Sequence, residues 1–144
     1  LPYTILTPHH GEIKRMLVGK TKDSRIETAL YASTIFESII IYKGAGTVIA
    51  SPDGIFYINT TGNSALARGG SGDALTGIIA SLYAINDSAI KSCSAATFIH
   101  GLAGDITSEE FTEISSSVED IIKNLPKAFR MIEERDNRLC KITY

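Results

Sequence analysis

The sequence predicts one α/β domain in which a mostly parallel sheet lies between helices and carries a β-hairpin. The chain has 144 residues, with 44% hydrophobic and 21% charged side chains, an ordinary composition for a single globular domain. Ile39–Tyr42 is a continuous apolar run, the pattern of a strand covered on both faces, as in a parallel sheet between helices. Residues 47–50 and 55–59 are two β-prone runs around a Ser-Pro-Asp-Gly turn, and they predict the hairpin.

Local signals predict the elements that precede this strand. Residues 3–7 form a short β-prone run that Pro8 ends, and a loop carrying His9 and His10 is expected after it. Ser24 and Glu27 have the spacing of a capping box, and apolar residues then recur at helical intervals. We therefore expect a helix over residues 24–38.

Three further helices are expected after the hairpin. Residues 62–72 are glycine-rich and polar, which predicts an irregular loop leading into a helix at about Ala74. An apolar, small-residue pattern predicts a second helix over residues 89–106. Ser116 and Glu119 have the spacing to cap a third helix, which Pro126 is expected to interrupt or restart.

Composition argues against several classes of partner. The formal net charge is −2 and no long basic block occurs, so nucleic acid is a poor candidate. No apolar run approaches the roughly 20 residues that a bilayer requires, and the first residues lack the layout of a secretory signal. We expect a cytoplasmic protein without membrane contact, in which Cys93 and Cys140 have structural or incidental roles.

The strongest chemical signal is the run Gly69, Gly70, Ser71, Gly72 and Asp73 at a predicted loop-to-helix junction. Glycines let backbone amides approach a ligand, and the positive end of the helix dipole favours phosphate. Asp73 could accept a proton from a hydroxyl group that attacks phosphorus. It could equally be a helix cap, and the string alone favours neither role.

A second glycine-bearing connection, Lys43, Gly44, Ala45, Gly46 and Thr47, follows the most apolar strand. Ligands of open α/β sheets collect at the carboxyl ends of strands, so this turn and the glycine-rich loop are expected to face one nucleotide. The alternative is a tight hairpin entry, because the string matches neither the Walker loop nor the dinucleotide fingerprint.

The histidines carry weaker signals. Adjacent side chains such as His9 and His10 point apart on an extended backbone, and no Cys, Asp or Glu stands at convincing metal-ligand spacing from them. Substrate contact by His9 is therefore preferred over a metal site. His100 lies in an apolar helical pattern and is expected to be a partly buried structural residue.

Four strings in this order, LTPHHGEIKRML, KGAGTVIASPDG, INTTGNSALARGGSGDALTGIIASL and FIHGLAGD, resemble the successive motifs of the NAD(P)H-hydrate dehydratase family of the ribokinase superfamily. The resemblance covers about Ile5 to Asp105. It implies a ribokinase-like fold and a reaction in which ADP, or ATP in many eukaryotic members, drives dehydration of NADHX or NADPHX back to NADH or NADPH.

The resemblance also implies roles for individual residues. Asp73 would be the base on the substrate hydroxyl, and amides of Gly70, Ser71 and Gly72 would hold the phosphoryl group. The adenine nucleotide would contact Gly72 together with Lys43, Gly44, Ala45, Gly46 and Thr47, whereas the hydrated dinucleotide would contact Asp73 together with Thr7, Pro8 and His9. Mg²⁺ is expected to accompany the phosphates.

This sequence departs from the family pattern at three positions. His10 stands where the commonest bacterial pattern has proline, and Thr60 and Ser64 stand where prolines often occur. The histidine-bearing first motif and the KGAGT form resemble the ADP-using bacterial branch.

The chain is also short for the family. Residues 1–144 are expected to be the C-terminal part of a single ribokinase-like dehydratase domain, an incomplete domain that is a fragment, self-associates or works with further residues. A small-molecule kinase of the same fold, and a nucleotide-binding or assembly module without activity, are the alternative functions.

Overall fold

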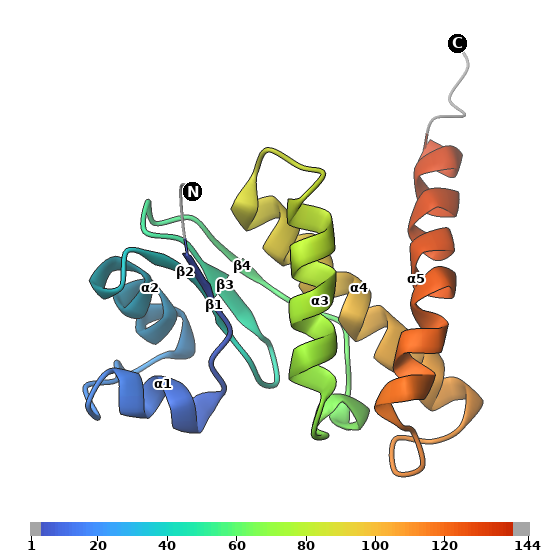
Figure 1. Ribbon diagram of the computed structural model, residues 1–144, viewed down its shortest axis with the longest axis horizontal. Helices are drawn as coiled ribbons and strands as arrows, with labels where there is room; N and C mark the ends of the chain where they lie inside the picture. Colours follow the sequence, from blue (N-terminus) through green and yellow to red (C-terminus); the bar gives the residue numbers. More distant parts are fainter. Residues whose placement is uncertain (1–3, 140–144) are drawn as a thin grey trace.

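The computed structural model describes the backbone of residues 4–139 and the side chains of residues 4–134 (Figure 1). It contains one four-stranded sheet in the order β1-β2-β3-β4, made of β1 (Thr4–Leu6), β2 (Ser38–Tyr42), β3 (Val48–Ala50) and β4 (Phe56–Ile58). Strands β1 and β2 are parallel, but β2–β3 and β3–β4 are antiparallel. The α/β class and the hairpin are confirmed, whereas the described sheet is mixed rather than mostly parallel. The reason is that the short connections after β2 can only join antiparallel neighbours.

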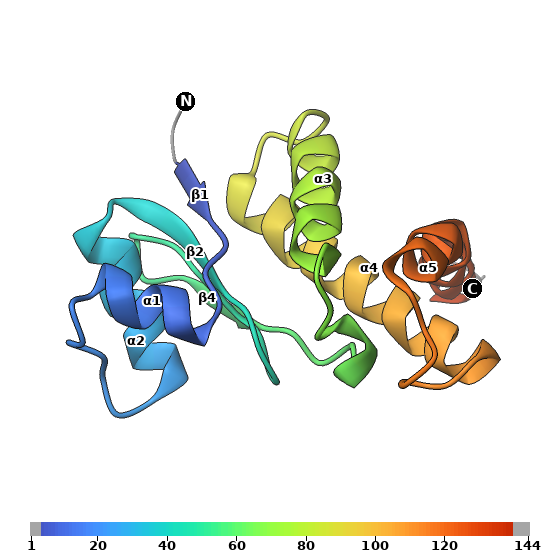
Figure 2. The ribbon, with the colours of Figure 1, turned by 60° about the horizontal axis from the view of Figure 1, so that its bottom comes forward.

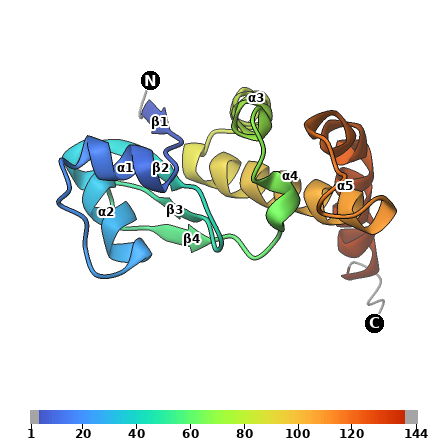
Figure 3. The same ribbon diagram turned by 90° about the horizontal axis from the view of Figure 1, so that it is seen from below.

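Helices cover both faces of the sheet (Figure 3). On one face lie α1 (His10–Met16) and α2 (Arg25–Ile35), and on the other lie α3 (Ser71–Tyr83) and α4 (Ala89–Glu110). All five residues of β2 are buried, and their alternating side chains serve both cores. Ile40 and Tyr42 pack with α1 and α2, whereas Ile39 and Ile41 pack with α3 and α4. The prediction of a strand covered on both faces is confirmed.

Helix α2 begins where the sequence predicts and ends earlier. Ser24 and Glu27 form the expected capping box, with the Glu27 amide 3.1 Å from Ser24 Oγ. The helix ends at Ile35 because Glu37 adopts a left-handed φ of 47° and turns the chain into β2. Ser38 therefore belongs to the strand.

Helix α5 (Val118–Leu139) packs against α4 on the side away from the sheet (Figure 2). The expectation that Pro126 would interrupt it is wrong, because Pro126 lies inside the helix on its exposed side, where water can replace the lost backbone bond. Ile121 and Ala128, on either side of the proline, are both fully buried against α4. The expected cap is displaced by one residue, and Ser117 with Asp120 forms it instead of Ser116 with Glu119.

The irregular loop contains a 3₁₀ turn, η1 (Ser64–Leu66), and α3 begins at Ser71 rather than near Ala74. Cys93 is buried in the core beside α3, as expected for a structural thiol, while Cys140 lies outside the described residues. Within residues 4–139, none of the helices combines the length and apolarity that crossing a bilayer would require.

Candidate functional site

The first two motifs meet at the carboxyl ends of β1 and β2. Because these strands are parallel, the segments that follow them leave the sheet at the same edge. The Lys43 amide donates to the Pro8 carbonyl at 2.9 Å, which joins the two segments directly. Pro8 itself is buried, Thr7 is half-buried and His9 is exposed.

The glycine-rich loop brings the third motif to the same place. Gly70 has a left-handed φ of 89°, which turns the chain into α3 at Ser71. A methyl group built on Gly72 would lie only 3.2 Å from Lys43 Nζ, so the lysine ammonium lies against the first turn of α3. Asp73 stands exposed in that turn. The structure therefore brings Asp73, its preceding glycines, the lysine turn and the first motif together.

The amides of this loop are not equivalent. The Ser71 N–H donates to the Arg68 carbonyl at 3.2 Å, and the Asp73 N–H donates to the Gly70 carbonyl at 3.1 Å. Within residues 4–134, neither the Gly72 N–H nor the Gly70 N–H has a protein acceptor. In this conformation the two glycine amides are without a protein acceptor among these residues, while the Ser71 amide is engaged in the turn.

His100, a residue of α4, contacts the first residue of α3, where the glycine-rich loop ends. Its Nε2 lies 3.3 Å from Ser71 Oγ, and both residues are buried. Burial lowers the pKa of His100 to about 4, so the ring is neutral at neutral pH. The sequence indicated a structural histidine, but its contact with Ser71 had no signal in the local pattern.

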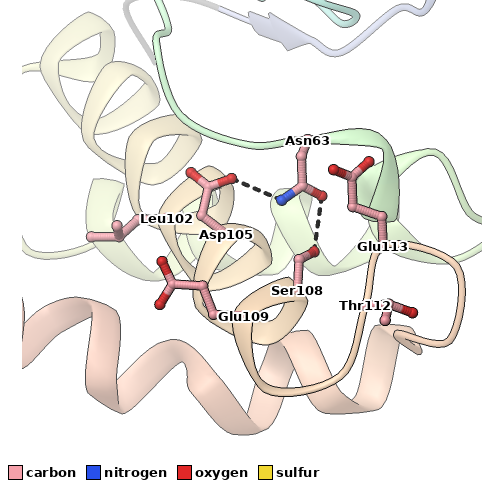
Figure 4. A pocket seen from close by; sticks show the side chains of 7 residues that line it. All are labelled: Asn63, Leu102, Asp105, Ser108, Glu109, Thr112 and Glu113. Atoms are coloured by element: carbon pink, nitrogen blue, oxygen red, sulfur yellow. Dashed lines mark hydrogen bonds between the residues drawn. The ribbon is translucent and has the colours of Figure 1, made fainter.

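Asp105 anchors the start of the glycine-rich loop to α4 (Figure 4). Its carboxylate accepts the Gly62 N–H and the Asn63 side-chain N–H, each at 2.9 Å. Ser108 Oγ donates to the other end of the same asparagine amide at 3.1 Å. These bonds hold the loop that leads into α3 at Ser71.

Two glycines of α4 allow this loop to lie against the helix. A methyl group on Gly101 would lie 2.7 Å from the backbone carbon of Thr61, and one on Gly104 would lie 2.9 Å from the Leu66 side chain. The FIHGLAGD string is therefore a docking surface for the loop, a role that the sequence analysis did not assign.

The first motif forms a helix rather than a loop. His9 is the N-cap of α1, with Nδ1 accepting the Glu12 amide at 3.2 Å, and His10 is its first residue. Proline is favoured at the first position of a helix, which explains why the commonest bacterial pattern can have proline at the position of His10. His10 instead places Nδ1 2.6 Å from the Tyr42 hydroxyl. The His9 N–H, assisted by the charge of Lys43, lowers the pKa of Glu12.

The lysine turn closes on itself. Thr47 Oγ1 donates to the Gly44 carbonyl at 2.9 Å and accepts the Gly44 amide at 3.2 Å. Gly44 and Gly46 both have positive φ, and Ala45 is exposed at the tip. The turn thus presents backbone rather than bulky side chains toward solvent.

Two hollows open near these motifs. One, of about 350 Å³, lies beside the first motif and is lined by Leu6, Thr7, Pro8, Glu12, Arg15 and Met16. The other, of about 710 Å³, lies beside the loop anchor and is lined by Asn63, Leu102, Asp105, Ser108, Glu109, Thr112 and Glu113 (Figure 4). Within the described residues, no group of three or more His, Cys, Asp and Glu side chains is placed to hold a metal ion.

The chain is similar in sequence to known proteins over most of its length. The chain is 41% identical over 134 residues to a bifunctional NAD(P)H-hydrate repair enzyme Nnr of Thermofilum pendens, covering 91% of this chain and 26% of that protein. It is 34% identical to an ADP-dependent (S)-NAD(P)H-hydrate dehydratase of Bacillus subtilis, covering 90% of this chain and 48% of that protein. The chain thus spans about a quarter to a half of the length of these relatives.

The fold is similar to solved structures as well. A structure of the Bacillus subtilis ADP/ATP-dependent NAD(P)H-hydrate dehydratase, co-crystallised with ATP and Mg²⁺, superposes with a TM-score of 0.81 at 33% identity, covering 90% of this chain and 48% of that one. A ribokinase-like superfamily protein of Enterococcus faecalis gives a TM-score of 0.73 at 28% identity, covering 88% of this chain and 44% of that one. The ribokinase-like fold is confirmed.

The family model for NAD(P)H-hydrate dehydratase matches residues 2–127, which is most of the chain. This chain belongs to the NAD(P)H-hydrate dehydratase family.

Proposed function

We propose that the protein carrying this chain dehydrates NADHX and NADPHX to NADH and NADPH, with ADP, or ATP, as phosphoryl donor. The observation that carries the proposal is the meeting of three motifs, in which Lys43 lies against Gly72 and pairs through its amide with Pro8. Family membership and the names of the relatives support the same reaction.

The chemistry divides between the carboxylate and the amides. Exposed Asp73 takes the proton of the ring hydroxyl as that oxygen attacks the terminal phosphorus of the nucleotide. The bond from this phosphorus to the bridging oxygen breaks, and AMP leaves when ADP is the donor, or ADP when ATP is the donor. Amides of Gly70 and Gly72 stabilise the charge on the transferred group, and Ser71 contributes its amide if the turn opens. The ring carbon–oxygen bond then breaks and phosphate leaves with its electron pair, while loss of a proton from the neighbouring ring carbon supplies the electrons of the new double bond.

The remaining motifs hold the two ligands. The adenine nucleotide lies along Lys43–Thr47, with the lysine ammonium at its phosphates and the exposed backbone of the turn around it. Mg²⁺ bound to the phosphates would neutralise part of their charge. The hydrated dinucleotide contacts Thr7, Pro8 and His9 beside the smaller hollow.

The test is to incubate the protein with NADHX and Mg·ADP, or Mg·ATP, and to follow NADH absorbance. Recovery of NADH supports the dehydratase. Phosphorylation of an alcohol without NADH recovery would instead indicate a small-molecule kinase. Nucleotide binding without any turnover would indicate a binding module.

Asp73→Asn tests the proposed base. Because the amide cannot accept the hydroxyl proton, we expect kcat to fall by about 100-fold or more while the nucleotide Kd stays within about twofold. Asp87→Asn is the matched control, since Asp87 is an exposed carboxylate in the turn before α4. Equal kcat values for wild type and Asp73→Asn would remove Asp73 from the mechanism.

We also propose that the protein self-associates. Strand β4 is an edge of the described sheet, and Phe56, Tyr57 and Ile58 are 42%, 37% and 50% exposed. Exposed apolar edges of this kind favour pairing with another chain. Light scattering after size exclusion tests this, and a monomer at all concentrations would contradict it.

A further inference from the structure

Arg25 lies beneath the lysine turn, although none of the four motifs contains it. Its Nη2 donates to the Tyr42 carbonyl at 2.9 Å and to the Lys43 carbonyl at 3.1 Å. Its guanidinium carbon lies 4.0 Å from the centroid of the Tyr42 ring. Arg25 therefore makes two contacts with Tyr42, the last residue of β2, and one with Lys43, the first residue of the turn.

Local structure directs Arg25 to this place. The capping box of Ser24 and Glu27 fixes the first turn of α2, and Arg25 is the first residue of the helix. Tyr42, its stacking partner, is buried and is itself held by the contact of its hydroxyl with His10. Hydrogen bonds from a charged donor are stronger than neutral ones, and a guanidinium on an aromatic face adds a cation–π attraction.

Gly44 shows how closely the guanidinium supports the turn. A methyl group on Gly44 would lie 2.9 Å from Arg25 Nη2, and the φ of Gly44 is 146°. The guanidinium thus occupies the space that a side chain at position 44 would need. Arg25 Nε is buried without a partner among the described residues, so the group is held by its Nη2 contacts and by stacking.

We propose that Arg25 is a positioning residue for the nucleotide. By fixing the Tyr42 and Lys43 carbonyls, it holds the Lys43–Thr47 turn open for phosphate and keeps Lys43 Nζ against Gly72. This inference rests on the proposed function, in which that turn binds the adenine nucleotide. Arg25 itself contacts the turn from the protein side and acts through it.

The test compares Arg25→Met and Arg25→Lys with wild type. For Arg25→Met we expect the ADP Kd to rise about tenfold, with kcat at saturating ADP and the KM for NADHX within about twofold. A lysine keeps the charge and one donor nitrogen but has no planar guanidinium to stack on the Tyr42 ring while that nitrogen donates, so Arg25→Lys is expected to recover less than half of the lost binding free energy. Full recovery by lysine would overturn the proposal, because charge alone would then suffice.

Lys22→Met is the matched control. Lys22 Nζ lies 4.1 Å from the centroid of the ring of Tyr31, a residue of α2, so this change also removes a cation stacked on a tyrosine. Among the described residues, Lys22 has no hydrogen bond to the Lys43–Thr47 turn. We expect its ADP Kd to equal that of wild type. An equal loss of ADP affinity in Lys22→Met and Arg25→Met would overturn the proposal.

Amide hydrogen exchange separates this inference from the proposed function. In the absence of any ligand, Arg25→Met is expected to speed exchange of the Gly44 N–H, which bonds Thr47 Oγ1 in the turn, by about tenfold, while core amides such as that of Ile40 are unchanged. Unchanged exchange at Gly44 would overturn the positioning role even if the protein binds ADP. Faster exchange in a protein that binds no ADP would refute the proposed function and leave the support of the turn intact.

Discussion

Burial of His100 predicts a specific loss of stability in acid. Its side chain is 5% exposed, and burial lowers its pKa from 6.5 to about 4. In the unfolded chain the imidazole gains a proton as the pH falls through 6.5, whereas the folded protein resists protonation until about pH 4. The contribution is therefore fully present above pH 6.5 and is lost as the pH falls toward about 4.

The size of the effect follows from the shift. At about 1.36 kcal/mol per unit of pKa, lowering the pH from about 7 to about 4.5 is expected to remove about 2.5 kcal/mol of unfolding free energy through this one group. His100→Gln lacks the titrating ring and is expected to escape this loss. Its stability at neutral pH will be lower if the Ser71 contact is weakened, but its dependence on pH will be flatter.

Urea unfolding at both pH values, for wild type and His100→Gln, measures the difference. Acidic groups with lowered pKa, such as Asp53, Glu110 and Asp120, also lose stability in acid, but both proteins share them and their contribution cancels. If the two proteins lose the same free energy between the two pH values, the neutral, buried state of His100 is wrong.

Two further substitutions test the local packing. Gly101→Ala is expected to cost about 1 to 3 kcal/mol, because the new methyl group would meet the Thr61 backbone, while Gly77→Ala, with nothing within 4 Å, is expected to gain about 0.5 to 1 kcal/mol in its helix. Thermal unfolding measures both, and changes of the same sign would contradict the packing argument. Ser24→Ala is expected to cost about 1 kcal/mol in urea unfolding by removing the cap that bonds the Glu27 amide, and an unchanged midpoint would show that the cap does not stabilise α2.

Much of the fold could be predicted because its signals are local. The capping box at Ser24, the apolar run of β2 and the glycine turn into α3 each occupy a few consecutive residues whose backbone preferences decide the outcome. The error at Pro126 has a different origin. Buried neighbours on both sides of the proline hold α5 together, and tertiary packing overrides the local preference.

The parts of the candidate site and the proximity of its two glycine-bearing segments were predicted, but their individual contacts were not. The strings around Asp73 and Lys43 indicated an anion loop and a nucleotide turn, and the resemblance connected them. Their contact through Gly72, and the Pro8 carbonyl that joins the first motif, depend on parallel pairing of β1 with β2.

The supporting residues required the tertiary structure. Arg25 and His100 lie far in sequence from the turn and the loop that they contact, and no spacing rule relates them. The sequence by itself determined the class of fold, the family and the candidate site residues, because these depend on local conformation and residue type. Only the tertiary structure decided which side chains support them, because contacts between distant segments depend on how the helices pack on the two faces of the sheet.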